Sequence, residues 1–313
     1  MIGTMMAPTS SVRLMNAFSP FLLSLRAKQW AKNLLLYLPL VFTINFWWTP
    51  GDLGHALRPF LQVTLAFALF CVLSSAIYLV NDVIDRDSDQ RHPAKRNRPI
   101  ASGRLSPGMA GAAAAVMGVG ALSVSFLLNP LFGVVALVYG ALSLGYSLYL
   151  KQLVIVDVMV LASGFVLRAA AGGVVIDVPI SPWLYICTTL GALFLACGKR
   201  RNELVLLGQG SAVHREALRE YTPALLDQMI AVITPSLLIS YSLYTFSAPN
   251  LPKNNAMMLT IPFVIYGIFR YLYLMHVRNL GGSPEDVLFS DRALLATVVL
   301  WAVAAGVVLL VSG

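Results

Sequence analysis

The chain has 313 residues, of which 58% are hydrophobic and 12% charged, and its mean hydropathy is +0.76. Soluble domains carry about twice that share of charged residues, so the composition excludes a water-soluble enzyme and predicts an all-α protein that crosses a membrane several times. The net charge of +8 does not indicate a nucleic-acid partner, because the Lys and Arg residues lie between apolar runs and not along one polar face.

Nine apolar segments are long enough to cross about 30 Å of hydrocarbon. They are residues 30–48, 58–80, 107–128, 130–150, 153–174, 182–198, 227–247, 256–277 and 291–312. Residues 1–29 precede them as an N-terminal cytoplasmic segment, and residues 30–313 form a single transmembrane domain. Only Lys151 and Gln152 separate the fourth span from the fifth, which predicts a tight helical hairpin at that point.

The distribution of Lys and Arg predicts the orientation, since cytoplasmic loops carry an excess of these residues. With the N-terminus in the cytoplasm, only Arg58 and Lys253 of the 22 Lys and Arg residues fall on the opposite side. Arg168 and Arg270 lie within spans. We therefore expect a cytoplasmic N-terminus, an external C-terminus and charged motifs that all face the cytoplasm.

The most polar stretch follows the second span and reads YLVNDVIDRDSDQRHPAKRNRPIASG, residues 78–103. On one continuous helix, four of its side chains fall within about a quarter-turn of arc, whereas Asp87 points away. These four are Asn81, Asp82, Asp85 and Asp89. Amide and carboxylate oxygens are the hard ligands that suit Mg²⁺, so all four are predicted metal ligands and the three aspartates predicted catalytic residues. The alternative is a solvated loop with scattered charge, which does not explain like charges gathered at a membrane without a cation.

A basic loop follows the aspartates. His92-Pro93 predicts the end of the helix, because proline cannot continue it. Lys95 and Arg98 come next, in a position where they would contact phosphate oxygens. Magnesium next to fixed cations indicates a diphosphate ligand.

Two interpretations stay open for each of the remaining cytoplasmic ends. Lys32 accompanies Trp30 in RAKQWAKN, either as an anchor at the membrane interface or as a phosphate contact. Tyr146 and Lys151 lie at the hairpin, where Lys151 is either an ordinary cytoplasmic charge or a substrate contact. Lys199 and Glu203 follow the sixth span, either as an ion pair four residues apart or as a wall of the site opposite the aspartates.

Two ionisable residues lie within the fifth span, where such groups are costly and usually face a polar cavity. Asp157 and Arg168 are about three helical turns and roughly 16 Å apart, which excludes a direct salt bridge and allows both to line one cavity. Gly172-Gly173 is expected to mark the end of this span. Later in the chain, Glu285 follows Ser283 and Pro284 in a pattern that helix capping explains, so it is not assigned to the site.

Residues 81–103 resemble the first aspartate-rich motif of the UbiA superfamily of intramembrane prenyltransferases, N-D-x-x-D-x-x-x-D followed by R-P-I-x-S-G. The resemblance implies nine helices around one cavity that faces the cytoplasm, and a prenyl diphosphate held through Mg²⁺ on two such motifs. The second motif is usually D-x-x-x-D, but here residues 199–203 read KRRNE. This change replaces an acid with a cation, and it suits a site in which one substrate is a phosphomonoester.

Five further motifs are similar to the decaprenyl-phosphate phosphoribosyltransferase branch of that superfamily: HPxKxxRPIA, YxLxLK, RAAAGG, GKRxxEL and PEDxxxxDR. The resemblance implies transfer of 5-phosphoribosyl from 5-phosphoribosyl diphosphate to a polyprenyl phosphate, with Mg²⁺ as cofactor and pyrophosphate released. The product would be a precursor of arabinose-donor lipids for the envelope, made at a bacterial plasma membrane. The substrate contacts expected on this basis are Asn81, Lys32, Lys95, Arg98, Tyr146, Lys151, Arg168, Lys199 and Glu203.

Two other functions stay open at this point. An aromatic-acceptor prenyltransferase of the quinone, tocopherol, chlorophyll or haem type would use a prenyl diphosphate, and the lysine in the second motif argues against it. A lipid or ion carrier would show internal repeats or broken helices, and no repeat is visible. The sequence indicates neither the prenyl chain length of the acceptor nor an oligomeric state.

Overall fold

The computed structural model describes residues 19–45, 48–49, 51–91, 95–179, 181–207 and 217–311. The long helices in these ranges are α3 (Leu53–Ile84), α5 (Pro107–Leu128), α6 (Pro130–Leu148), α7 (Val156–Val175), α8 (Pro182–Leu207), α10 (Pro223–Ser247), α11 (Ile261–Val277) and α13 (Arg292–Val311). Between them lie the short helices α2 (Leu38–Phe42), α4 (Arg86–Arg91), α9 (Ala217–Glu220) and α12 (Pro284–Ser290). Three segments are 3-10 helices: η1 (Ala27–Tyr37), η2 (Leu150–Gln152) and η4 (Ala256–Thr260).

The starts of three long helices are encoded locally. Ser106, Asn129 and Thr222 each precede a proline at the first helical position, where its missing N–H costs nothing. The side-chain oxygen of each accepts a hydrogen bond from a backbone N–H of the first turn. α5, α6 and α10 therefore begin where the sequence supplies both a cap and a proline.

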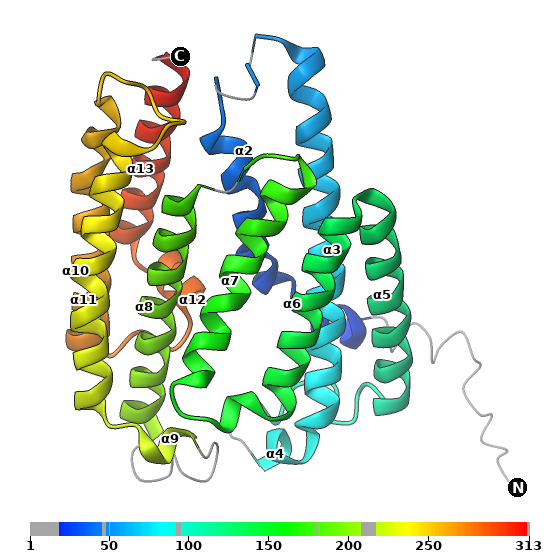
Figure 1. The fold of residues 1–313 in the computed structure, drawn as a ribbon. Coiled ribbons are helices and arrows are strands. Elements are labelled where there is room, and N and C mark those ends of the chain that lie inside the picture. Colours follow the sequence, from blue (N-terminus) through cyan, green and yellow to red (C-terminus); the bar gives the residue numbers. More distant parts are fainter. Residues whose placement is uncertain are drawn as a thin grey trace, which may run out of the picture.

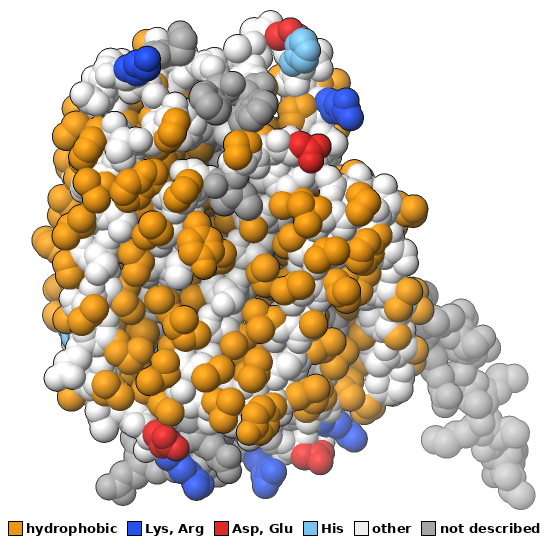
Figure 2. All heavy atoms as spheres, in the orientation of Figure 1, with side chains coloured by type: hydrophobic (Ala, Val, Ile, Leu, Met, Phe, Trp, Pro, Cys, Tyr) orange, Lys and Arg blue, Asp and Glu red, His pale blue; other side chains and the backbone are white. Residues whose placement is uncertain are grey.

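Long helices run side by side and alternate in direction, with α4 and α9 at one end of the bundle and the C-terminus at the other (Figure 1). On the face that Figure 2 shows, hydrophobic side chains cover the middle, and Lys, Arg, Asp and Glu lie toward the two ends. By length and composition, seven helices of the described ranges are candidate membrane spans. The predicted all-α fold is confirmed, and the count of nine spans stays a prediction.

Two predicted spans differ from the seven. Residues 30–48 do not form one long helix, because η1 gives way to the short α2, which ends at Phe42. The sixth predicted span is present as α8, but its last turns carry the polar motif at residues 199–203. The hairpin after α6 is also looser than predicted, since residues 149–155 connect α6 to α7 and include η2.

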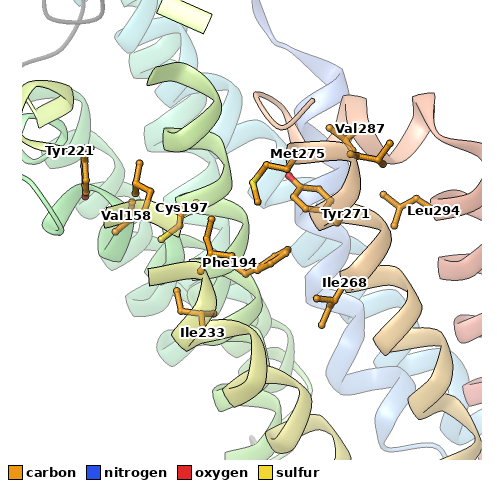
Figure 3. Packing of buried hydrophobic residues seen from close by; sticks show 14 residues of the cluster. Val158, Phe194, Cys197, Tyr221, Ile233, Ile268, Tyr271, Met275, Val287 and Leu294 are labelled. Carbon is orange, nitrogen blue, oxygen red and sulfur yellow. The ribbon is translucent and has the colours of Figure 1, made fainter. Parts of the chain in front are cut away.

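Buried apolar residues form two main clusters that meet at α7. One cluster joins α7 to α8, α10, α11, α12 and α13, and Figure 3 shows its packing around Phe194, Met275 and Leu294. The other joins α7 to η1, α3, α5 and α6. The polar side chains of α7 consequently lie between two apolar halves of the bundle.

Gly172 allows η1 to pack directly on α7. A Cβ atom at this position would lie 2.0 Å from the carbonyl oxygen of Leu36, far inside van der Waals contact. The Gly172-Gly173 pair was expected to end the helix, but α7 continues to Val175. The physical reason for glycine here is the close approach of another backbone and not helix termination.

Gly172→Ala is therefore expected to lower the free energy of unfolding by about 1–3 kcal/mol, because η1 must move to admit the methyl group. Thermal unfolding in detergent, followed by tryptophan fluorescence, measures the effect. Gly111→Ala is the matched control, since nothing lies within 4 Å of its Cβ position on α5. Equal midpoints for the two variants would contradict the close packing of η1 on α7.

Candidate functional site

The predicted aspartate helix is interrupted at Asp85. α3 ends at Ile84, Asp85 is its C-cap, and α4 starts at the next residue, whereas a single helix up to His92-Pro93 was predicted. His92 and Pro93 themselves lie outside the described residues. The backbone N–H of Asp85 still donates to Asn81, and that of Asp89 to Asp85, so the spacing of four residues survives the break. The acids therefore remain close together despite the change of helix.

Asp82 and Asp89 converge on one guanidinium group. Each is only 2% exposed, and Nη1 of Arg98 lies 3.2 Å from Oδ1 of Asp82 and 2.6 Å from Oδ2 of Asp89. Arg26 donates to the same Asp82 oxygen, and its guanidinium lies over the ring of Tyr78. Arg98, predicted as a phosphate contact, thus bridges two buried carboxylates in this structure.

Asp85 faces a different cation. Nζ of Lys151 lies 2.8 Å from Oδ1 of Asp85, which ties the α6–α7 connection to the end of α3. Lys95 lies in the turn that leads to Arg98, whose backbone N–H donates to the Lys95 carbonyl. Asp87 is exposed, as its position on the helix predicted. The structure thus brings two of the predicted cations, Lys151 and Arg98, to the predicted aspartates.

The aspartates at the end of α3 could hold a metal ion only together with other ligands. Among the described residues, no three Asp, Glu, His or Cys side chains converge closely enough to hold a metal by themselves. Mg²⁺ at phosphate-binding sites is usually held by one or two carboxylates, and substrate oxygens and water complete its shell. Asp82 and Asp89 fit such an ion, because they already share one positive group. Direct coordination by Asn81 or Asp85 stays a prediction.

A second polar cluster surrounds Arg200 on α8. Its side chain is 1% exposed, and its nitrogens lie 2.5 Å from Asp157, 2.6 Å from Glu203 and 2.6 Å from the hydroxyl of Tyr146. Tyr221 donates to the other oxygen of Asp157 at 2.7 Å. Arg200 therefore pairs with Glu203, the acid of its own motif, and with Asp157 of α7. Lys199, the preceding residue, is half-buried.

The turn before α7 is strained and is fixed by Tyr221. Ile155 has a φ of 67° and a ψ of −46°, and the N–H of Val156 donates to the carbonyl of Val154, which together form a γ-turn that β-branched residues rarely adopt. The Ile155 N–H donates to the Tyr221 hydroxyl at 2.7 Å. Burial, reinforced by Asp157, raises the pKa of Tyr221, so the phenol stays protonated and donates to that carboxylate.

Arg168 belongs to a third cluster. Its guanidinium donates to Asn33 and to the hydroxyl of Tyr139, each at 2.7 Å, and lies 4.7 Å above the Tyr139 ring. As predicted, Arg168 does not pair with Asp157, whose cation is Arg200. The guanidinium is buried and held by neutral oxygens, so its charge is not cancelled by a contacting carboxylate.

Lys32 and Glu285 form a fourth cluster at a cavity. Nζ of Lys32 lies 3.4 Å from Oε1 of Glu285, and Gln29 bonds to both side chains. Burial alone would raise the pKa of Glu285, but the charge of Lys32 and the hydrogen bond from Gln29 hold it below its usual value. Trp30 donates to Ser75 of α3, so this segment packs inside the bundle and Lys32 is not a plain interface anchor.

Three of the four clusters, those of Asp82, Arg168 and Glu285, lie near one phenol beside an apolar cavity. The phenol of Tyr78 lies within electrostatic range of Arg26, Asp82, Arg168 and Glu285. The cavity, about 650 Å³, is bounded by η1, α8, α10, α11, α12 and α13, and its charged lining residues are Lys32 and Glu285. Elsewhere its wall is apolar and aromatic, with Phe165, Trp183 and Trp301 among its residues. Such a lining suits a hydrocarbon chain with a polar head at the Lys32 end.

Residues 36–285 match the model of the UbiA prenyltransferase family. The chain belongs to this family. It is 33% identical to decaprenyl-phosphate phosphoribosyltransferase of Mycobacterium tuberculosis over 90% of this chain and 92% of that protein. It is 35% identical to the Corynebacterium glutamicum protein of the same name over 89% of this chain and 83% of that protein. A solved UbiA homolog from Archaeoglobus fulgidus, bound to GPP and Mg²⁺, has the same fold with a TM-score of 0.70, 18% identity, and coverage of 93% of this chain and 99% of that one.

For this UbiA family member, the resemblance drawn from the motifs is confirmed, as is the all-helical fold, whereas the nine spans and the orientation of the cavity stay predictions. Three charged residues of the clusters were missing from the predicted site, as were neutral partners such as Asn33, Tyr139 and Tyr221. Arg26 and Arg200 were treated only as positive charges near membrane ends, and Glu285 as part of a helix cap. Ser283 is indeed the N-cap of α12, although its side chain makes no capping hydrogen bond. Only the tertiary contact with Lys32 indicates a further role for Glu285.

Proposed function

We propose that this UbiA family member is a Mg²⁺-dependent pentosyltransferase that moves 5-phosphoribosyl from 5-phosphoribosyl diphosphate to a polyprenyl phosphate, such as decaprenyl phosphate. The observation that carries the proposal is the similarity to phosphoribosyltransferases at 33–35% identity along about nine-tenths of the chain. The second motif supports it, because residues 199–203 carry three cations and one acid, and Arg200 pairs with that acid, Glu203, as well as with Asp157. That motif therefore supplies positive charge where prenyltransferases of the family carry a second set of acids.

The end of α3 would hold the sugar donor. Asp82 and Asp89 would hold Mg²⁺, with Asn81 and Asp85 as its further proposed ligands. When bound, Mg²⁺ supplies positive charge that neutralises the diphosphate as its bond to the sugar breaks. Arg98 would then contact the donor's phosphates together with Lys95, as a guanidinium suits bidentate phosphate binding.

The polyprenyl phosphate would lie with its chain in the apolar cavity and its head toward the cations. Lys32 stands at the polar end of that cavity. Lys151 and Lys199 are the other proposed contacts of the acceptor phosphate, and Tyr146 a further one. Arg168 would add further positive charge to the site. In the described part of the chain its guanidinium contacts only neutral groups, so no contacting carboxylate cancels this charge.

The transfer needs no general base. An anionic phosphate oxygen of the acceptor forms a bond to C1 of the ribose, and the bond from C1 to the diphosphate oxygen breaks. The bonding electrons leave with pyrophosphate, and no proton is transferred. The protein's task is to align the two anions and to offset their repulsion, which fixed cations in a cavity of low dielectric achieve.

We further propose nine spans in a bacterial plasma membrane, with the N-terminus and the site at the cytoplasmic side. The distribution of Lys and Arg supports this orientation. A phosphorylated sugar donor is a cytoplasmic metabolite by its charge, since it does not cross a bilayer unaided. A site at that side would receive it directly.

The test is to incubate the purified protein in detergent with Mg²⁺, decaprenyl phosphate and phosphoribosyl diphosphate labelled in the ribose. Label in the organic phase is expected, and EDTA or the Asp85→Ala substitution should abolish it. A parallel reaction contains a prenyl diphosphate and hydroxybenzoate. Prenylation of the aromatic acceptor without label in the lipid would overturn the proposal and leave the family assignment intact.

A further inference from the structure

Two buried polar atoms at the cavity lack a hydrogen-bond partner among the described residues. They are Oε2 of Glu285 and the hydroxyl oxygen of Tyr271. Buried polar groups are nearly always hydrogen-bonded, and each unsatisfied group costs about 1–3 kcal/mol. Both residues line the apolar cavity described above. An unsatisfied acceptor and an unsatisfied donor at one cavity indicate a ligand that supplies both partners.

Tyr271 is held rigidly with its hydroxyl at the second motif. The residue is 6% exposed, and its ring packs on that of Phe194 with centroids 5.4 Å apart. Figure 3 shows it projecting from α11 into the cluster that also contains Met275 and Val287. A Cβ atom on Gly198 would lie 3.6 Å from the ring, so the phenol lies against the α8 backbone immediately before Lys199.

Glu285 approaches the same place from α12. Its Oε1 accepts from the Gln29 nitrogen at 2.6 Å and lies 3.4 Å from Nζ of Lys32, whereas Oε2 has no partner among the described residues. Its charge acts on the Tyr271 phenol as well as on Tyr78, which also lies within range of Asp82. Tyr271 therefore lies next to the second motif, and Glu285 lies within electrostatic range of Tyr271.

The chemistry of the pair selects the group that it binds. A carboxylate oxygen can only accept, and a phenol whose oxygen is unpartnered has its proton to donate. A phosphate oxygen in contact with Oε2 would meet a like charge, because Lys32 lies on the Oε1 side of the carboxylate, and a hydrocarbon would satisfy neither atom. An alcohol satisfies both, because its proton goes to Glu285 and its oxygen accepts from Tyr271.

We propose that Tyr271 and Glu285 bind a ribose hydroxyl of the sugar donor and thereby select a hydroxylated donor over a prenyl diphosphate, which has no hydroxyl. This inference rests on the proposed phosphoribosyl transfer and specifies the part of the site that recognises the sugar. Tyr271 and Glu285 are binding residues and take no part in bond breaking. Sites built around a substrate hydroxyl discriminate strongly against analogues that lack it.

The experiment measures kcat/KM for three donors: phosphoribosyl diphosphate and its analogues lacking the 2- or the 3-hydroxyl. Each is tested with the wild type, Tyr271→Phe and Glu285→Gln, which preserve the ring and the side-chain shape. Wild type should prefer the natural donor over one analogue by about 10- to 100-fold or more, and both variants should lose most of that preference. Tyr244→Phe is the matched control, because it removes a phenol from the far end of the same cavity.

Each outcome separates the two proposals. Loss of discrimination in both variants, but not in Tyr244→Phe, supports the hydroxyl site. Active variants that keep the full preference of the wild type would overturn the inference alone, and would mean that water satisfies the two atoms. A wild type that transfers no sugar from any donor overturns the proposed function, and the hydroxyl site with it.

Discussion

Replacement of Asp89 by asparagine is expected to reduce phosphoribosyl transfer by about 100-fold or more, through loss of electrostatic stabilisation of the departing diphosphate. The substitution keeps the size of the side chain and removes one of the two carboxylates that converge on Arg98. Without it, Asp82 would be the one remaining carboxylate of the buried pair, so the Mg²⁺ concentration required for half-maximal rate should also rise. Initial rates of lipid labelling over a range of Mg²⁺ concentrations measure both effects.

Asp87→Asn provides the matched control for this prediction. Asp87 lies two residues earlier on the same short helix and is exposed to solvent. The two substitutions change the net charge equally, so general electrostatic effects cancel in the comparison. A similar loss of rate in both variants would show that Asp89 acts only through the charge of the region, against the geometry of the pair.

The largest effect on stability is expected from Arg200→Met. Its removal leaves the buried carboxylate of Asp157 without a cation and frees Glu203, and breaking a buried pair on one side typically costs about 3–5 kcal/mol. The thermal midpoint in detergent should fall accordingly. Arg201→Met is the control, because Arg201 pairs with the half-exposed Asp227, and such pairs contribute at most about 1 kcal/mol.

A double variant tests the cause of that loss. Adding Asp157→Asn to Arg200→Met removes the stranded charge, so a substantial part of the lost stability should return. Stability that does not recover would indicate that lost packing of the arginine side chain, and not the unpaired carboxylate, dominates the effect.

The sequence predicted the membrane-spanning helices well where apolar runs are long and bounded by a cap or a proline. It failed at residues 30–48, where the apolar run folds as η1 and α2. Hydropathy averages over a window and does not reveal a change of helix type. Nor does it reveal that η1 packs against Gly172, more than a hundred residues later, where a side chain would not fit.

The sequence likewise predicted part of the candidate site. The aspartates, Lys151 and Arg98 could be found from spacing and charge, because each lies near an apolar boundary. The contacts between side chains of the site could not be found, because many of them join residues that are distant in the chain. Examples are Arg26 with Asp82 and Gln29 with Glu285. Glu285 was missed because a local explanation, the start of a helix, was sufficient for its presence.

Several charged groups of the site serve two partners at once. Arg98 contacts two aspartates, Asp82 accepts from two arginines, and Arg200 contacts two acids. Removal of one partner therefore changes the geometry and charge balance of the shared group, and through it those of the other partner. Effects of single substitutions here should not sum, with coupling energies of about 0.5–3 kcal/mol between neighbours. Such a site tolerates paired exchanges better than single ones, so its specificity is more readily altered by changing two positions together than one after the other.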